Sequence, residues 1–116
     1  MSKTRPTTST KPHPCRLCGA VIDPGETHYA WTVADQRSRA HAACRAYARA
    51  RMPGWERSTD ADMVLRDIWR RCWQRDAGML DEDGIAGVLD EFPELSRAVD
   101  ALRARVAYVA GLQAAQ

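Results

Sequence analysis

Residues 15–19 of this chain read Cys-Arg-Leu-Cys-Gly, and residues 41–44 read His-Ala-Ala-Cys. Two thiols separated by two residues can bind one metal ion from a tight turn. A histidine and a cysteine three positions apart can complete a tetrahedral site from the first turn of a helix. Gly19 follows the first pair, where such a turn needs a positive φ that glycine adopts without strain. The spacing predicts one zinc ion (Zn2+) bound by Cys15, Cys18, His41 and Cys44.

Other interpretations of these residues are less well supported. A redox Cys-x-x-Cys needs a βαβ context that the sequence lacks, and it would leave His41-x-x-Cys44 without a role. An open catalytic zinc site would need one of the four ligands to be a bystander, and no glutamate stands where hydrolase motifs place a general base. His13 and His28 are possible substitute ligands, but we expect His13 to be solvated and His28 to be exposed or partly packed.

The composition is that of an ordinary globular protein. The 116 residues are 45% hydrophobic and 28% charged, which suits one domain with a helical extension. No apolar run approaches the ~20 residues that a membrane span needs, and the N-terminus lacks the apolar core of a signal peptide. We therefore expect a cytoplasmic protein without membrane contact, in which thiols stay reduced and Cys72 is left over.

The charge is distributed unevenly. Residues 37–75 hold ten arginines against four acids, a net charge of +6, whereas residues 76–100 hold eight acids against one arginine, a net charge of −7. Such asymmetry can mark a surface that faces a polyanion, or it can help the two segments pack together. The chain has fifteen arginines, only two lysines and many alanines, a bias typical of GC-rich bacterial or phage genomes.

The first half of the chain shows turn, strand and helix signals in that order. Residues 1–14 are rich in Ser, Thr, Pro and Lys, and we expect a disordered arm there. Pro24-Gly25 marks a turn, and residues 27–33 alternate β-branched and aromatic side chains, which predicts a strand. The polar residues 35–39 should turn the chain toward a partner strand or directly into a helix, which begins near Ala40 and ends before Pro53-Gly54.

A zinc knuckle, a hairpin and a helix in this order, with Cys-x2-Cys…His-x2-Cys and the strand Gly-Glu-x-His-Tyr-x-Trp, resemble the treble-clef zinc fingers. The resemblance covers about 40 residues. It extends to the first zinc module of LIM domains, to poly(ADP-ribose) polymerase fingers and to small bacterial and phage zinc proteins. It implies a zinc-binding module over residues 15–54 with the four ligands named above. HNH nucleases share the motif, but this chain contains no Asn and commits His41 to zinc, so we do not expect a nuclease.

Residues 55–116 predict a three-helix extension packed on the zinc module. The first helix should run from Thr59 to Ala77, with Gly78 closing it, and should place Trp69 and Trp73 in the core. The acids at 81–83 fit the N-cap of a second helix better than a calcium loop, whose register fails here. Pro93 should begin the third helix.

That last helix carries a narrow apolar stripe at spacings of 4-3-4-3. The stripe lies within residues 95–109, and it packs on the helix of residues 59–77, forms the seam of a homodimer or enters a partner's helix groove. A monomer and a homodimer therefore both remain open. Its members are Leu95, Val99, Leu102, Val106 and Val109. Together these elements predict an α+β protein, mostly helical, in which a treble clef precedes three helices.

No catalytic constellation emerges, and we expect a non-enzyme. The first candidate function is protein binding, as a small adaptor or inhibitor of phage origin that acts on a host or defence protein. The alternative is a nucleic-acid-binding transcriptional regulator that uses the basic surface of residues 37–75. Some of these arginines also fit solvated helix pairs, Asp62 with Arg66 and Asp67 with Arg71. The candidate binding residues are Arg37, Arg39, Arg45, Arg49, Arg66, Arg70, Arg71 and Arg75.

Overall fold

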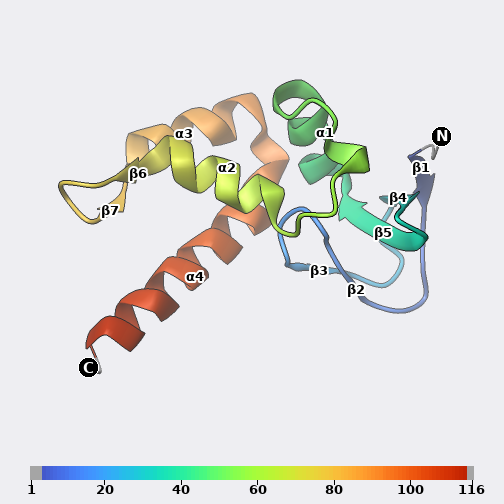
Figure 1. Ribbon diagram of the computed structural model, residues 1–116, viewed down its shortest axis with the longest axis horizontal. Helices are drawn as coiled ribbons and strands as arrows, with labels where there is room; N and C mark the ends of the chain where they lie inside the picture. The colour runs from blue at the N-terminus through green and yellow to red at the C-terminus, as the bar shows by residue number, and fades with distance from the viewer. Residues whose placement is uncertain (1–3, 115–116) are drawn as a thin grey trace.

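Short antiparallel strands and one helix form the first half of the chain in the computed structural model, which describes residues 4–114 (Figure 1). One sheet has the strand order β1-β4-β5, and a separate two-stranded ladder joins β2 to β3. The elements are β1 (Arg5–Thr7), β2 (His13–Pro14), β3 (Val21–Ile22), β4 (His28–Val33), β5 (Gln36–His41) and α1 (Ala42–Arg51). The knuckle, the hairpin and the helix thus follow one another as predicted.

The β4–β5 hairpin is closed by a two-residue loop. Ala34 and Asp35 have φ values of 50° and 61°, the left-handed pair that matches the right-handed twist of the strands. One face of this hairpin is buried, because Trp31 and Ser38 lie opposite each other in the register and are each 3% exposed. Trp55 packs edge-on against Trp31 with ring centroids 5.1 Å apart. The aromatic alternation that predicted the strand therefore also fixes which face is buried.

Residues 1–14 are not a disordered arm over the part that the structure describes. Arg5–Thr7 pair with β4 at the sheet edge, and His13–Pro14 pair with Val21–Ile22. Pairing at a strand edge uses backbone N–H and C=O groups, so it does not need the apolar side chains on which the prediction relied. Residues 1–3 lie outside the described part of the chain.

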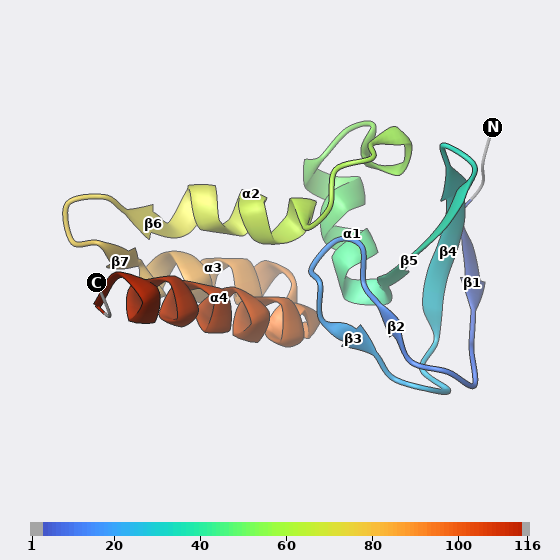
Figure 2. The ribbon, with the colours of Figure 1, turned by 60° about the horizontal axis from the view of Figure 1, so that its bottom comes forward.

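Three helices and a small hairpin form the second half of the described chain. In Figure 2 the three helices lie alongside one another, and the β1-β4-β5 sheet stands at the other end of the molecule. Both α3 and α4 contact α2. The elements are η1 (Trp55–Arg57), α2 (Met63–Cys72), β6 (Trp73–Gln74), β7 (Met79–Leu80), α3 (Glu82–Glu91), η2 (Pro93–Leu95) and α4 (Ser96–Ala114).

The helix predicted over residues 59–77 is shorter at both ends. It begins at Met63, after Asp62, which has a φ of 59° and makes no side-chain cap. It ends at Cys72, because the following residues form β6 and turn at Gly78 into β7. The predicted limits were wrong because both ends are set by backbone partners elsewhere in the fold, which a local propensity does not report.

Of the two later helices, α3 begins where its capping residues predict, whereas α4 begins three residues after the predicted Pro93. The carboxylate of Asp81 accepts the Asp83 N–H at 3.1 Å and caps α3, so the acids there serve the helix N-terminus. Pro93 opens the 3-10 turn η2, which leads into α4 at Ser96. The described part of the chain is α+β, with antiparallel strands first and helices after them.

The core of the second half lies between α2, α3 and the first turns of α4. On the apolar stripe of α4, Leu95, Val99 and Leu102 are at most 3% exposed, which confirms intramolecular packing for this part of the stripe. Val109 is 45% exposed, so the stripe continues beyond the core. None of the helices over residues 4–114 combines the length and apolarity that crossing a bilayer requires.

The change in burial along α4 gives a direct test of this packing. Val99→Ala should lower the free energy of unfolding by about 2 kcal/mol, because it removes two buried methyl groups and leaves a cavity. Val109→Ala, the matched change at an exposed position, should cost about 0.5 kcal/mol or less. Urea denaturation followed by circular dichroism measures both values. Equal losses of unfolding free energy in the two variants would contradict the packing of α4.

Candidate metal centre

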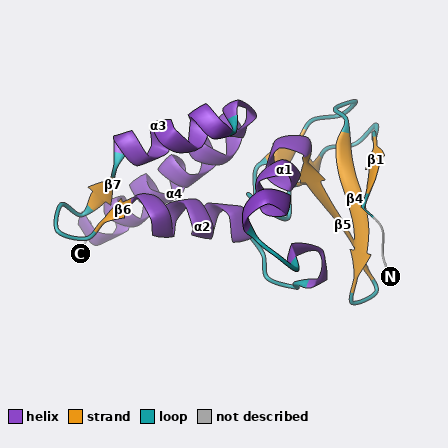
Figure 3. Ribbon diagram, turned by 90° about the horizontal axis from the view of Figure 1, so that it is seen from above, coloured by secondary structure: helices purple, strands orange, loops and turns teal. Residues whose placement is uncertain are grey.

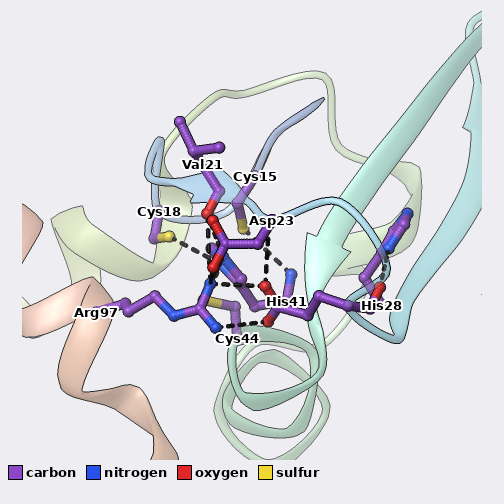
Figure 4. A network of polar contacts seen from close by, with 9 residues as sticks. Cys15, Cys18, Val21, Asp23, His28, His41, Cys44 and Arg97 are labelled. Atoms are coloured by element: carbon purple, nitrogen blue, oxygen red, sulfur yellow. Dashed lines mark hydrogen bonds and ion pairs between the residues drawn. The ribbon is translucent and has the colours of Figure 1, made fainter. Parts of the chain in front are cut away.

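Three segments of the first half bring three cysteines and one histidine together. Cys15 and Cys18 lie between β2 and β3, His41 ends β5, and Cys44 lies in the first turn of α1. Their ligand atoms all lie within 4.8 Å of one another, and all four residues are buried. Figure 4 shows the side chains converging from the knuckle, the strand and the helix. The residues predicted from the sequence spacing thus form one cluster.

The knuckle that presents the first two cysteines is fixed by its own backbone. The Gly19 N–H donates to the Cys15 carbonyl at 2.7 Å, and the Cys15 N–H donates to the Ala20 carbonyl at 2.9 Å. Gly19 has a φ of 78°, which confirms the conformation expected directly after the second cysteine. The His41 N–H points at the Cys15 sulfur, 3.4 Å away, and ties the knuckle to β5.

The ring of His41 is oriented by a hydrogen bond on the side away from the sulfurs. Its Nε2–H donates to the Val21 carbonyl at 3.0 Å, and its Nδ1 faces Cys18 and Cys44 at 3.4 and 3.9 Å, where a metal ion would take the place of a proton. Arg97 also donates to this carbonyl, at 3.4 Å. A carbonyl partner on the outer nitrogen is the arrangement that fixes the tautomer of metal-binding histidines.

A cation at the centre of the cluster would stabilise its ionised thiols. Burial would lower the pKa of His41, but hydrogen bonds and charge from Cys15 and Cys18 raise it to about 10. The neighbouring sulfurs of Cys15 and Cys18, together with burial, raise the pKa of the Cys44 thiol far above its ordinary value. Buried thiols this close cannot all ionise without a compensating positive charge, which a divalent ion supplies.

The geometry and the donor types fit a tetrahedral ion. Sulfur at about 2.3 Å and nitrogen at about 2.0 Å from a zinc ion place the ligand atoms of a tetrahedron about 3.5–3.8 Å apart. The distances from His41 Nδ1 to the Cys18 and Cys44 sulfurs, 3.4 and 3.9 Å, lie close to this range. Three soft sulfur donors and one imidazole disfavour calcium and magnesium, which prefer oxygen. The cluster therefore suits a metal ion of the zinc type.

An ion pair connects the cluster to the last helix. Arg97 at the start of α4 donates to both carboxylate oxygens of Glu26, at 2.7 and 2.8 Å. Burial works against ionisation of Glu26, but its hydrogen bonds with Arg97 and the Asp23 N–H outweigh burial and lower its pKa. Figure 4 shows the guanidinium of Arg97 beside His41, so α4 is joined to the loop that follows the knuckle.

Neither possible substitute histidine enters the cluster. His13 lies half-buried with its Nε2 2.9 Å from the Ser9 hydroxyl. The prediction that His28 is exposed or partly packed was wrong, because His28 is fully buried. Its Nδ1–H donates to the Glu26 carbonyl at 2.9 Å, and its Nε2 accepts from Arg39 at 2.8 Å. His28 lies on the face of β4 away from Tyr29, where His13 of β2 packs beside it with ring centroids 6.3 Å apart.

The eight arginines predicted as a binding surface are divided between several surfaces. Arg45 lies over the Tyr29 ring at 4.0 Å, whereas Arg39 lies opposite Ala30 and therefore on the other face of the sheet. Arg37 is exposed on β5, and Arg49 is exposed on α1. The basic run in the sequence is not one continuous face.

The remaining members belong to α2 and the turn after it. Arg71 pairs with Asp67 at 3.0 Å, which confirms that predicted helix pair. The expected pair between Asp62 and Arg66 is not formed, because Asp62 contacts Arg105 of α4 at 3.1 Å. Arg66 lies 3.9 Å from Asp60 instead. The two others, both exposed and without an acidic partner in the described chain, are Arg70 and Arg75.

A groove between α2 and α4 was not predicted. It encloses about 540 Å³ and is lined by Leu65, Trp69 and Trp73 on one side and by α4 on the other. Trp69 is 42% exposed and stacks on Trp73 with ring centroids 5.5 Å apart, so the prediction of a core position for Trp69 was wrong. The signal available in the sequence was the length of the apolar stripe over residues 95–109.

No protein-family model, curated protein or solved structure matches this chain. Its function must therefore be argued from its own residues.

Two cysteines provide a matched test of the metal centre. Cys44→Ala removes a ligand and should lower the affinity for the metal ion by more than about 100-fold, because losing a ligand costs more than losing an outer-shell partner. Cys72→Ala removes an equally buried thiol from the core of the second half and should keep one metal ion per chain. Elemental analysis of the purified variants measures the metal content. Equal metal content in both would contradict the site.

Proposed function

We propose that the cluster binds one zinc ion and that the ion is structural. Four protein donors complete a tetrahedron, so they leave no position for water or substrate. The order of knuckle, hairpin and helix supports a treble-clef module. A module this small buries little apolar surface, so binding of the ion would supply folding free energy directly.

We further propose that the protein is not an enzyme and that it acts by binding a protein partner. The observation that supports this function is the apolar groove between α2 and α4. An exposed tryptophan beside an open groove is unusual on a surface that stays in water, and tryptophan is enriched where interfaces carry most of their binding energy. Trp69 lies in this groove beside Val106 and Val109, and two-fifths of its surface is exposed.

The groove fits an amphipathic helix with acidic flanks. A space between two parallel helices accepts the apolar side of a third, with anchors one turn apart. Arg66 and Arg105 are the charged residues that line the groove, and no acid lines it within the described part of the chain. Each already contacts one carboxylate near the start of α2, whereas Arg70, one turn beyond Arg66, has no acidic partner in the described chain. Charge complementarity therefore favours an acidic partner.

A synthetic helix tests this function without a known partner. The probe is a peptide of about 18 residues, roughly five helical turns, with leucines along one side and glutamates beside them. It should bind saturably and change the fluorescence of Trp69. Trp69→Ala should weaken binding by about 30-fold, the effect of losing an interface hot spot. A peptide with lysines in place of glutamates should bind at least about tenfold more weakly.

Tyr108→Ala is the control for this experiment. Tyr108 is also aromatic and is 67% exposed on α4, but it does not line the groove, so its removal should leave peptide binding unchanged. Equal binding of the acidic and basic peptides would contradict the charge argument. Sedimentation of the protein alone gives the other decisive outcome, because a dimer that Trp69→Ala dissociates would show that a second copy fills the groove.

A phage origin, a host or defence protein as the target and a cytoplasmic location remain predictions from the sequence. None of the four cysteines forms a disulfide bond.

A further inference from the structure

The outward face of the β1-β4-β5 sheet carries arginines from its two outer strands. Residues directly opposite each other in antiparallel strands point to the same face. Arg5 lies opposite Ala30, and Ala30 lies opposite Arg39, so the three form one row across the sheet. Arg37 lies two residues from Arg39 on β5 and shares this face. This face therefore presents three guanidinium groups, those of Arg5, Arg37 and Arg39, which we call the arginine row.

The opposite face of the sheet is covered. Trp31, Ser38 and Ala40 are at most 3% exposed, and Trp55 and α1 pack over this side. Arg5 and Arg37 are exposed. Figure 3 shows the sheet at the end of the molecule away from α2–α4, with α1 on its inner side. The face with the arginine row is therefore open to solvent at Arg5 and Arg37, whereas His28 and Ala30 on it are at most 4% exposed, and His13 of β2 packs beside His28.

A cleft beside β5 extends this positive surface. It encloses about 530 Å³ and runs from the arginine row to the start of α2, with His13, Arg16, Arg37 and Arg39 among its lining residues. Asp62 is the only carboxylate among the residues that line the cleft, and it contacts Arg105. The cleft therefore offers no free negative charge.

The first half of the chain carries an excess of positive charge. Residues 4–54 carry eight arginines and lysines against three acids, and two of these acids, Asp23 and Glu26, contact Arg97. Positive charge thus dominates this end of the molecule.

Two buried partners hold arginines of the cleft in place. His28 is fully buried and accepts from Arg39 Nη1 at 2.8 Å, which fixes the guanidinium of Arg39. Arg16 donates to the Ser38 hydroxyl at 3.0 Å and to the Thr59 carbonyl at 2.6 Å, so it joins β5 to the segment before α2. Burying a histidine is costly unless it makes hydrogen bonds, and these bonds orient a surface cation. The positive surface is preorganised.

We propose that this sheet face and its cleft bind the phosphate backbone of duplex nucleic acid. Guanidinium groups bind phosphate oxygens through paired N–H donors, and a flat row of them matches a polyanion better than a single anion. Single-strand binding relies on exposed aromatic rings that stack on bases. Tyr29 and Trp31 lie on the face that α1 and Trp55 cover, and the other face carries Arg, Thr, Ala and His side chains. The site would therefore recognise the phosphate charge of the nucleic acid and not its base sequence.

Fluorescence anisotropy with a labelled duplex of about 20 base pairs tests this site. Three phosphate contacts predict that binding weakens by about 40-fold between 50 and 200 mM salt. Removing two contacts with Arg5→Ala/Arg37→Ala should weaken binding at low salt and reduce the salt slope by about two-thirds. A single strand of the same length should bind more weakly than the duplex.

The control is a second double variant with the same change in net charge. Arg49→Ala/Arg75→Ala removes two exposed arginines away from the sheet face and should leave both affinity and salt slope unchanged. Equal weakening by the two double variants would overturn the proposal, because attraction would then come from overall charge. Binding to a phosphoserine peptide without binding to the duplex would also overturn it.

This surface is independent of the groove between α2 and α4. Arg5→Ala/Arg37→Ala should not alter binding of the acidic helical peptide, and Trp69→Ala should not alter binding of the duplex. Failure of the duplex experiment would therefore leave the proposed protein-binding function standing, and failure of the peptide experiment would leave the nucleic-acid site standing.

Discussion

The convergence of three cysteines and a histidine determines how the rest of the chain is placed. The cluster joins the knuckle to the end of β5 and the first turn of α1, and the knuckle then receives the next helix. The Asp62 N–H donates to the Arg16 carbonyl at 2.8 Å, and the Val64 N–H donates to the Leu17 carbonyl at 3.0 Å. The start of α2 is thus capped by knuckle carbonyls and needs no side-chain cap. The metal centre therefore positions α2 as well as α1.

Ion pairs within the fold neutralise part of the uneven charge of the chain. Arg51 of α1 contacts Glu91 of α3, Arg97 contacts Glu26, and Arg103 contacts Glu82. These pairs are substantially exposed, so each contributes little to stability, but together they favour one arrangement of the segments. The acidic residues of the second half are consequently engaged in part by arginines of the chain. The first half keeps its excess of positive charge, since arginines on the sheet face have no acidic partner among residues 4–114.

The sequence allowed the metal site to be predicted better than the fold around it. Ligand spacing within Cys15–Cys18 and His41–Cys44 is a local property that a turn and a helix start determine directly. The edge strand β1 and the burial of His28 depend instead on backbone pairing and on what covers β4, and neither leaves a pattern in the side chains. The early end of α2 follows from the β6–β7 pairing. Trp69 belongs to the apolar pattern of α2, so its exposure could be predicted only from the way α4 packs beside α2.

The two proposed surfaces depend on the metal centre in different ways. In Figures 2 and 3 the β1-β4-β5 sheet stands at one end of the molecule, and α2, α3 and α4 extend toward the other. The sheet face depends on β5, whose last residue is His41, and the groove depends on α2, whose first N–H groups are bound by the knuckle. Loss of the ion would release the knuckle from β5 and from α1. It would therefore disturb both surfaces at once, and the cleft beside β5 most directly, because Cys15 is among the residues that line it.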